Sequence, residues 1–263
     1  MSDSTTQNVF PYRSDYARGD RHDDYQPYRP TAAGPTGLSG TAVEQAEDVF
    51  KYVALTHTRY LGQLEGDRHR YSETGFAEQA AAFGETAAAK AVDSAVERVQ
   101  ARADQAQAAV DRMRASFIKL GDAAQESRNL RYWNRTRALL DTADTGSKFT
   151  AAEELLGKAD RAELSVLLEE LPSYLQSHIG PMGAETKHKL GLSKDADWSD
   201  WIDITYMPRV VPEYGKARDR LANATKALMA THHSAGAIKQ AIAAGRRINE
   251  RTLASAHKYD PDK

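Results

Sequence analysis

The sequence has 263 residues, no cysteine and a net charge of −2 at pH 7, from 35 basic and 37 acidic side chains. The missing cysteines exclude disulfides and thiolate-bound metals. The near-neutral charge excludes a global electrostatic field that would attract nucleic acid or an anionic membrane. Alanine occurs 43 times, against 11 valines and 7 isoleucines, and alanine favours helices whereas β-branched residues favour strands. We therefore expect an all-α protein with thin cores, because a buried alanine removes little apolar surface from water.

Residues 1–40 are expected to form an extended docking arm, because prolines and glycines interrupt them and no apolar period appears. The tripeptide Pro-Tyr-Arg occurs twice in the arm, and tyrosine and arginine are favoured anchors at protein interfaces. Two interpretations stay open: a segment that binds a neighbouring subunit, and a solvated tail. The candidate interaction residues are Tyr12, Arg13, Tyr16, Tyr25, Tyr28 and Arg29.

Targeting and membrane signals are missing from the sequence. The first 25 residues contain several aspartates and no apolar run, which is not the pattern of a signal peptide. No apolar stretch approaches the ~18 residues that a membrane span requires. We expect a location in the cytoplasm or in a virion, and no membrane partner.

Residues 41–145 are predicted to form a long antiparallel helical hairpin or a helical bundle. Thr41 and Glu44 have the spacing of a capping box, and apolar or ring-bearing residues follow every three or four positions, with His57 as a core or interface histidine. A second stripe of this kind predicts a coiled-coil-like seam. Packing within the chain and a seam shared between chains both fit the pattern. The seam residues are Val92, Val96, Val99, Val110, Met113, Phe117 and Leu120.

An arginine-rich stretch follows the seam on the same predicted helix. Arg128, Arg131 and Arg135 fall on one helical face, with Tyr132 and Trp133 beside them. Three interpretations stay open: packing of the arginine stems against apolar surface, contact with an acidic partner, and nucleic-acid binding.

Residues 146–263 are predicted to form a smaller helical subdomain. Thr150 and Glu153 have capping-box spacing and should begin one of its helices. Pro172 is expected to kink or restart another helix.

Two tryptophans follow in a less regular stretch. Trp198 and Trp201 belong to one amphipathic turn or a short strand, and we interpret them as a core plug in preference to an exposed anchor.

The end of the sequence is predicted to be a basic helix pair. Ser234 is expected to cap the second helix of the pair, and the tail from Tyr259 is expected to fray. The basic residues of this predicted helix pair are a second candidate for contact with nucleic acid or an acidic partner. They are Arg246, Arg247 and Arg251.

Motifs that carry chemistry are missing. The sequence has no phosphate-binding loop, dinucleotide fingerprint, zinc-protease helix or nucleophile elbow, so we expect no enzyme, no cofactor and no metal site. The leading hypothesis is a structural or assembly protein that acts through protein partners in a homo- or hetero-oligomeric complex. In architecture alone it is broadly similar to scaffold, minor capsid or connector components of tailed bacteriophages. The alternative is a helical nucleic-acid-binding protein that uses residues 128–137 and the basic end.

Overall fold

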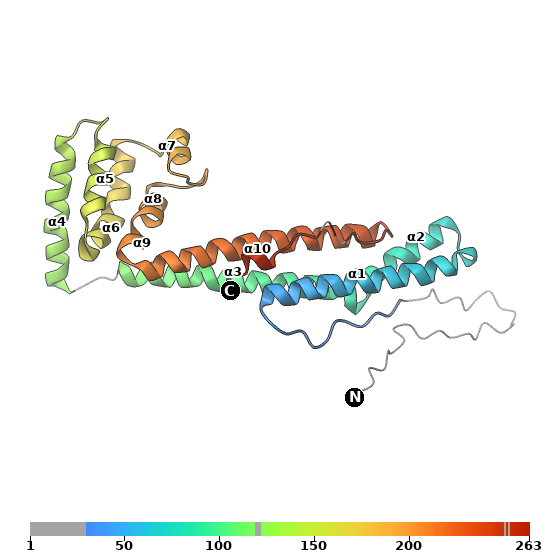
Figure 1. Cartoon of the computed structure of the whole chain (residues 1–263). Coiled ribbons are helices and arrows are strands. Elements are labelled where there is room, and N and C mark those ends of the chain that lie inside the picture. The colour runs from blue at the N-terminus through green and yellow to red at the C-terminus, as the bar shows by residue number, and fades with distance from the viewer. Residues whose placement is uncertain (1–29, 119–121, 250, 252) are drawn as a thin grey trace. The chain divides into compact units, whose positions relative to one another are not determined.

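The computed structural model describes residues 30–118, 122–249, 251 and 253–263. Every regular element within these residues is a helix, and none of them lies in a strand (Figure 1). The all-α prediction is therefore confirmed. The more specific arrangement, a long hairpin with a coiled-coil-like seam, stays a prediction.

The chain divides into two compact units. Unit 1 comprises residues 1–105 and 222–263, and unit 2 comprises residues 106–221. Two long helices, α3 (Ala87–Phe117) and α10 (Pro212–Ala243), contribute one part to each unit. The boundaries predicted from the sequence fall after residues 40 and 145 instead. The structure differs because the core of unit 1 takes residues from both ends of the chain.

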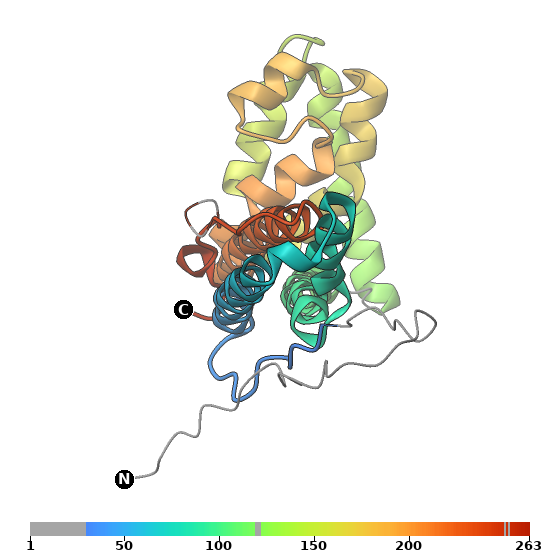
Figure 2. The same cartoon turned by 90° about the vertical axis from the view of Figure 1, so that its right-hand side faces the viewer.

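Unit 1 is built around three helical segments: α1 (Ala42–Gly66), the first part of α3 and the second part of α10. These segments lie side by side (Figures 1 and 2). Unit 1 also contains α2 (Glu73–Ala82) and the one-turn 3₁₀ helices η1 (Arg68–Arg70), η2 (Phe83–Glu85) and η4 (His257–Tyr259). Its core is rich in alanine, and the alanines buried by the three long segments include Ala46, Ala54, Ala88, Ala95, Ala227 and Ala235.

The predicted start and the predicted apolar stripe of α1 are confirmed. The Thr41 hydroxyl accepts a hydrogen bond from the Glu44 amide, and the Glu44 carboxylate accepts one from the Thr41 amide, which is the reciprocal capping box. Residues at heptad spacing then turn one face of the helix into the core. The buried members of this stripe are Val43, Ala46, Phe50, Val53, His57, Tyr60 and Leu64.

The described end of the predicted docking arm packs on its own chain. Residues 30–40 form no helix until α1 begins. Ala32 is buried, and its carbonyl oxygen accepts a hydrogen bond of 3.1 Å from the amide of Ala88 in the first turn of α3. The Tyr52 hydroxyl donates to the carbonyl oxygen of Ala33 at 3.0 Å. Residues 30–40 are therefore fixed to α1 and α3, whereas the six candidate interaction residues of the arm lie outside the described residues.

The prediction of a basic helix pair at the carboxyl end is wrong. α10 is one helix of 32 residues that continues through Ser234. Ser234 is fully buried, and its hydroxyl accepts a hydrogen bond from the Ala254 amide at 2.9 Å, so it fastens a distant segment and does not cap a helix. Arg246 and Arg247 follow the end of α10 in irregular backbone.

The prediction that the tail frays is also wrong. Residues 254–263, which we call the C-terminal strap, pack on α1. One carboxylate oxygen of Glu47 accepts hydrogen bonds from the amides of Ala256 and His257 at 2.8 and 2.9 Å. Thr41, the cap of α1, donates from its hydroxyl to the buried Asp260. These contacts give the backbone of the strap polar partners that a solvated tail lacks.

Ion pairs at the end of the strap extend this attachment. Arg102 of α3 holds Asp262 through two nitrogen atoms, with Nε 2.8 Å from Oδ2. Lys263 lies 2.7 Å from the Glu44 carboxylate. The Lys263 ammonium and the Thr41 amide hold the pKa of Glu44 below its ordinary value. The strap thus adds a cation, Lys263, to the capping box that begins α1.

Unit 2 contains six helices within its described residues, besides its parts of α3 and α10. They are α4 (Ala123–Thr142), α5 (Lys148–Lys158), α6 (Arg161–His178), α7 (Ala184–Lys189), α8 (Trp198–Thr205) and α9 (Met207–Val210). α3 ends at Phe117 and Asp122 caps α4, so the predicted continuous helix from the seam into the arginine-rich stretch is interrupted. The core of unit 2 is rich in leucine and aromatic residues, and four leucines of α6 are fully buried: Leu164, Leu167, Leu171 and Leu175.

Local predictions in unit 2 have mixed outcomes. Trp198 and Trp201 are 4% and 0% exposed on α8, so the core plug is confirmed and the turn is helical. α6 continues through Pro172 without a restart, since buried leucines on both sides hold it in place. Thr150 does not begin α5, which starts at Lys148. The Lys148 ammonium donates to two carbonyl oxygens at the end of α4, each at 2.8 Å, and this contact sets the earlier start.

Gly245 ends α10 in a conformation that requires glycine. Its φ is +59°, and the Arg246 amide donates to the carbonyl oxygen of Ala241 at 2.9 Å, as in a Schellman motif. A Cβ atom on Gly245 would lie 2.8 Å from the Cβ of Ala80. We predict that Gly245→Ala lowers the free energy of unfolding by ~1–3 kcal/mol, because it adds backbone strain and a steric clash. Chemical denaturation measures this change.

Gly236→Ala is the matched control for this prediction. Gly236 lies inside α10, and its Cβ position has no neighbour within 4 Å. Alanine should raise the free energy of unfolding there by ~0.5–1 kcal/mol. Equal effects of the two substitutions would contradict the assigned role of Gly245.

Candidate interaction face on α4

α4 packs on unit 2 through one side only. Trp133, Thr136 and Leu140 are its buried residues, and the Trp133 ring meets the Tyr174 ring of α6 edge-on, with centroids 5.9 Å apart. The Asp122 carboxylate accepts a hydrogen bond from the Gln125 amide at 2.8 Å and so caps the helix. This packing leaves a broad outer face of α4 uncovered within unit 2.

The structure places Arg128, Arg131 and Arg135 on that outer face, where all three are exposed. Arg128 donates to the Gln125 side chain at 2.8 Å, and Arg131 donates to the carbonyl oxygen of Ser127 at 3.1 Å. Among the described residues none of these three arginines forms an ion pair, whereas Arg137 lies 3.7 Å from Asp141. The three guanidinium groups therefore keep their charge available for an outside partner.

Two leucines flank the arginines. Leu130 is 61% exposed and Leu139 is 62% exposed. They are nine residues apart, or about two and a half helical turns, so they lie on opposite edges of the outer face with arginines between them. We call Arg128, Leu130, Arg131, Arg135 and Leu139 the α4 face. Arginine is enriched at protein interfaces, and the two exposed leucines add apolar surface to the same face.

The predicted seam residues are divided between two cores. Val92 and Val99 are buried in the core of unit 1, and Val96 packs against it. Val110 and Phe117 are buried in the core of unit 2, and Met113 packs against it. Leu120 lies outside the described residues. Side chains of the same chain thus already cover the described seam residues.

The second basic set does not join the α4 face in one unit. Arg246, Arg247 and Arg251 are exposed and belong to unit 1. Arg247 lies 3.6 Å from the carboxylate of Glu65 on α1. Part of the charge of this set is therefore already balanced within unit 1.

Sequence reasoning missed a buried polar cluster in unit 2. Arg114 of α3 lies 3.0 Å from the Asp203 carboxylate of α8, and it also donates to the Ser199 hydroxyl at 2.6 Å. Asp203 is 2% exposed, and burial raises its pKa to about 6 against the opposing charges of Arg114 and Arg218. The only sign of this cluster in the sequence is that the acidic Asp203 follows Ile202 in an otherwise apolar helical turn. We interpret the cluster as a structural link between helices.

His57 is the buried ionisable side chain of α1. It is 0% exposed and its ring lies 4.8 Å from the Phe83 ring. Neither ring nitrogen has a hydrogen-bond partner among the described residues. Burial lowers its pKa to about 4. The prediction of a core histidine is confirmed, and the absence of ring partners means that only the neutral form is compatible with this core.

No group of three or more metal-binding side chains occurs among the described residues. None of the helices described is both long and apolar enough to span a membrane. Comparisons with protein families, curated proteins and solved structures find no match to this chain. The α4 face is therefore identified by its geometry alone.

We predict that His57 makes unit 1 sensitive to acid. Its folded pKa of about 4 lies below the ordinary value of 6.5. The stability that depends on neutral His57 is therefore complete above pH 6.5 and is lost as the pH falls toward 4, by ~1.4 kcal/mol per pH unit. Between pH 7 and pH 5, His57→Leu should lose ~2 kcal/mol less free energy of unfolding than the parent protein in chemical denaturation. The exposed His232, changed to leucine, is the control, and an unaltered pH slope in His57→Leu would refute the prediction.

We predict the opposite pH dependence for Asp203. Its folded pKa of about 6 lies above the ordinary 3.8, so the folded state loses stability as the pH rises through this interval. Asp203→Asn should remove that loss and leave the free energy of unfolding at pH 7 unchanged or up to ~3 kcal/mol higher. Denaturation at pH 5 and pH 7 measures it, with the exposed Asp195→Asn as control. A decrease of more than ~1 kcal/mol at pH 7 would mean that attraction to Arg114 outweighs the cost of burial.

Proposed function

We propose that this protein is a helical structural component of a multi-copy assembly and that it binds a second copy of itself through the α4 face. The observation that carries this proposal is the pair of leucines, each more than 60% exposed, on either side of arginines that lack an ion-pair partner in the described part of the chain. Burying a leucine contributes ~1.5–3 kcal/mol. An interface over this face would therefore gain apolar burial and charge pairing together.

The choice of cation supports a protein partner. α4 has four arginines and no lysine, and interfaces are enriched in arginine and depleted in lysine. Arginine forms planar, bidentate pairs with carboxylates. A second copy offers suitable carboxylates, since Glu169 and Glu170 of α6 are both exposed.

The kind of assembly is proposed from the sequence organisation. An aromatic amino-terminal arm, a long helical hairpin with a coiled-coil-like seam and a location in a virion would fit a scaffold, minor capsid or connector-like component of a tailed bacteriophage. The described seam residues are covered within the chain, and this supports placing the contact between copies on α4.

We predict that the full-length protein associates with itself as its concentration rises, and that two double variants weaken this association at least tenfold. Leu130→Gln with Leu139→Gln removes apolar contact, and Arg131→Glu with Arg135→Glu reverses the charge. All four side chains are exposed, so both variants should keep the thermal stability of the parent protein. Sedimentation velocity from micromolar to millimolar concentration measures the association.

Leu55→Gln is the matched control, because Leu55 is 49% exposed on α1 and lies outside the α4 face. It should associate like the parent protein. A monomer at every concentration, or equal weakening by the control, would overturn the proposal.

Nucleic-acid binding is the second candidate, and it uses the same unpaired arginines. It differs in two measurable respects: binding falls steeply with salt, and it tolerates the leucine double variant. Fluorescence anisotropy with a labelled oligonucleotide at ~50 mM salt tests it. Binding that the charge reversal abolishes and the leucine variant preserves would favour this candidate over self-association.

A further inference from the structure

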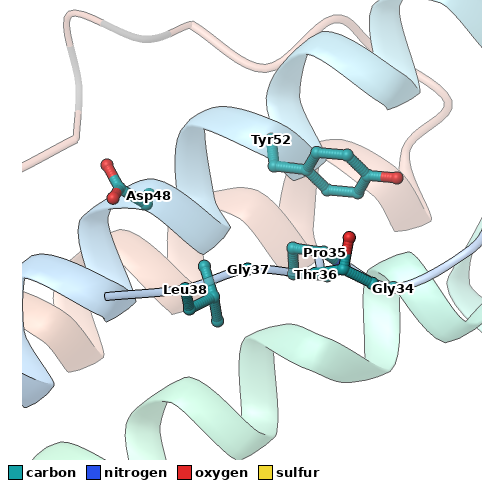
Figure 3. A pocket seen from close by; sticks show the side chains of 7 residues that line it. All are labelled: Gly34, Pro35, Thr36, Gly37, Leu38, Asp48 and Tyr52. Atoms are coloured by element: carbon teal, nitrogen blue, oxygen red, sulfur yellow. The ribbon is translucent and has the colours of Figure 1, made fainter. Parts of the chain in front are cut away.

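A loop at the start of unit 1 separates two surface hollows. Residues 34–38 pass between α1 and α3, and Figure 3 shows the hollow of about 310 Å³ on the α1 side, with Asp48 and Tyr52 beside the loop. A second hollow of about 340 Å³ lies between the same loop and α3. We call the second one the α3 hollow. Such a volume is at the lower end of the range for small-molecule sites.

The α3 hollow combines a polar side with an apolar side. Lys90, Ser94 and Arg98 follow each other at intervals of four on α3, so they line one face of that helix. Pro35 and Leu38 supply apolar surface from the loop, and the fully buried Val49 of α1 lies behind them. A ligand that matches both sides carries a negative group and a short apolar body.

Arg98 has one donor that lacks an acceptor. Its Nε atom is buried and has no hydrogen-bond partner among the residues that the structure describes. Two other cations of the same helix have carboxylate partners: Lys90 lies 3.3 Å from Glu85, and Arg102 holds Asp262. A buried donor without an acceptor destabilises a protein, and guanidinium groups are usually paired when they are withdrawn from water. The hollow is therefore lined by an arginine that has one unsatisfied donor within the described part of the chain.

We propose that the α3 hollow binds a carboxylate that is carried on a short apolar body. A rotation of the flexible Arg98 side chain presents Nε and one terminal nitrogen to both carboxylate oxygens, which is the bidentate geometry that arginine favours. Pro35 and Leu38 contact the apolar body. The carboxylate can belong to a free monocarboxylic acid or to an acidic side chain between apolar residues of a peptide. This inference does not depend on the function proposed for α4.

The test follows the Nε–H signal of Arg98 in ¹⁵N-correlated NMR spectra of the full chain. The probes are hexanoate and the peptide acetyl-Leu-Glu-Leu-amide, each compared with a neutral counterpart, hexanamide or acetyl-Leu-Gln-Leu-amide. We expect a saturable shift with a charged probe and none with its neutral counterpart. Saturation by hexanoate alone identifies a small-acid site, and preferential saturation by the peptide identifies a site for an acidic segment.

Arg98→Met assigns the signal and tests the site. It removes the orphaned donor and keeps the apolar stem, so it should fold with unchanged or raised thermal stability. Its affinity for the charged probe, measured from the backbone amide shifts of α3, should fall at least tenfold. Arg59→Met is the matched control, because Arg59 is exposed on α1 and outside the hollow. The proposal is overturned by equal binding in Arg98→Met, by equal binding of the neutral probes, or by no saturable shift, which would mean that water satisfies Nε.

Discussion

Close approach of alanine-lined helices is the constraint on which unit 1 depends. Ala88, Ala95 and Ala227 are each 0% exposed, yet a buried alanine contributes little apolar area. Small side chains stabilise a core only when helix backbones lie close together and dispersion contacts are dense. Polar contacts must then fix the alignment of the helices. The C-terminal strap supplies several of them, through the Glu47 carboxylate and the Thr41 cap.

Unit 2 reaches stability by a different route. Its core contains leucine, tryptophan and tyrosine, which bury more surface per residue. A core of this kind can hold an ion pair such as that of Arg114 and Asp203, where burial and attraction oppose each other. Unit 1 buries a neutral histidine without partners instead. We therefore expect protonation of these two buried groups to change stability in opposite directions.

Local rules predicted much of the helical structure, and contacts between distant residues explain most of the errors. The capping box at Thr41 and the spacing of the α1 stripe depend on neighbours within a few residues, so the sequence pattern contained them. The strap is held by Glu47, which lies more than two hundred residues away from its hydrogen-bond partners. The composition of the tail contains no sign of this contact, and it therefore predicted fraying. Ser234 was predicted to cap a helix because serine is a common capping residue. Its hydroxyl instead binds the amide of Ala254, which lies 20 residues further on. The sequence predicted that the arginines of α4 share one face. It did not predict the exposure of Leu130, because that depends on which side of α4 is covered by α6.

The order of the units along the chain has a consequence for synthesis. Residues 106–221 of unit 2 are translated between the two parts of unit 1. At ~5–20 residues per second, the first part waits on the order of ten seconds for the second. During that interval the apolar stripe of α1 lacks the part of α10 that covers it, and Glu47 lacks amides that lie 209 and 210 residues further along. Unit 2 is continuous and can close earlier. A chain that ends soon after residue 221 would therefore have one finished unit and one open apolar stripe, and such a chain is a suitable substrate for chaperones and proteases.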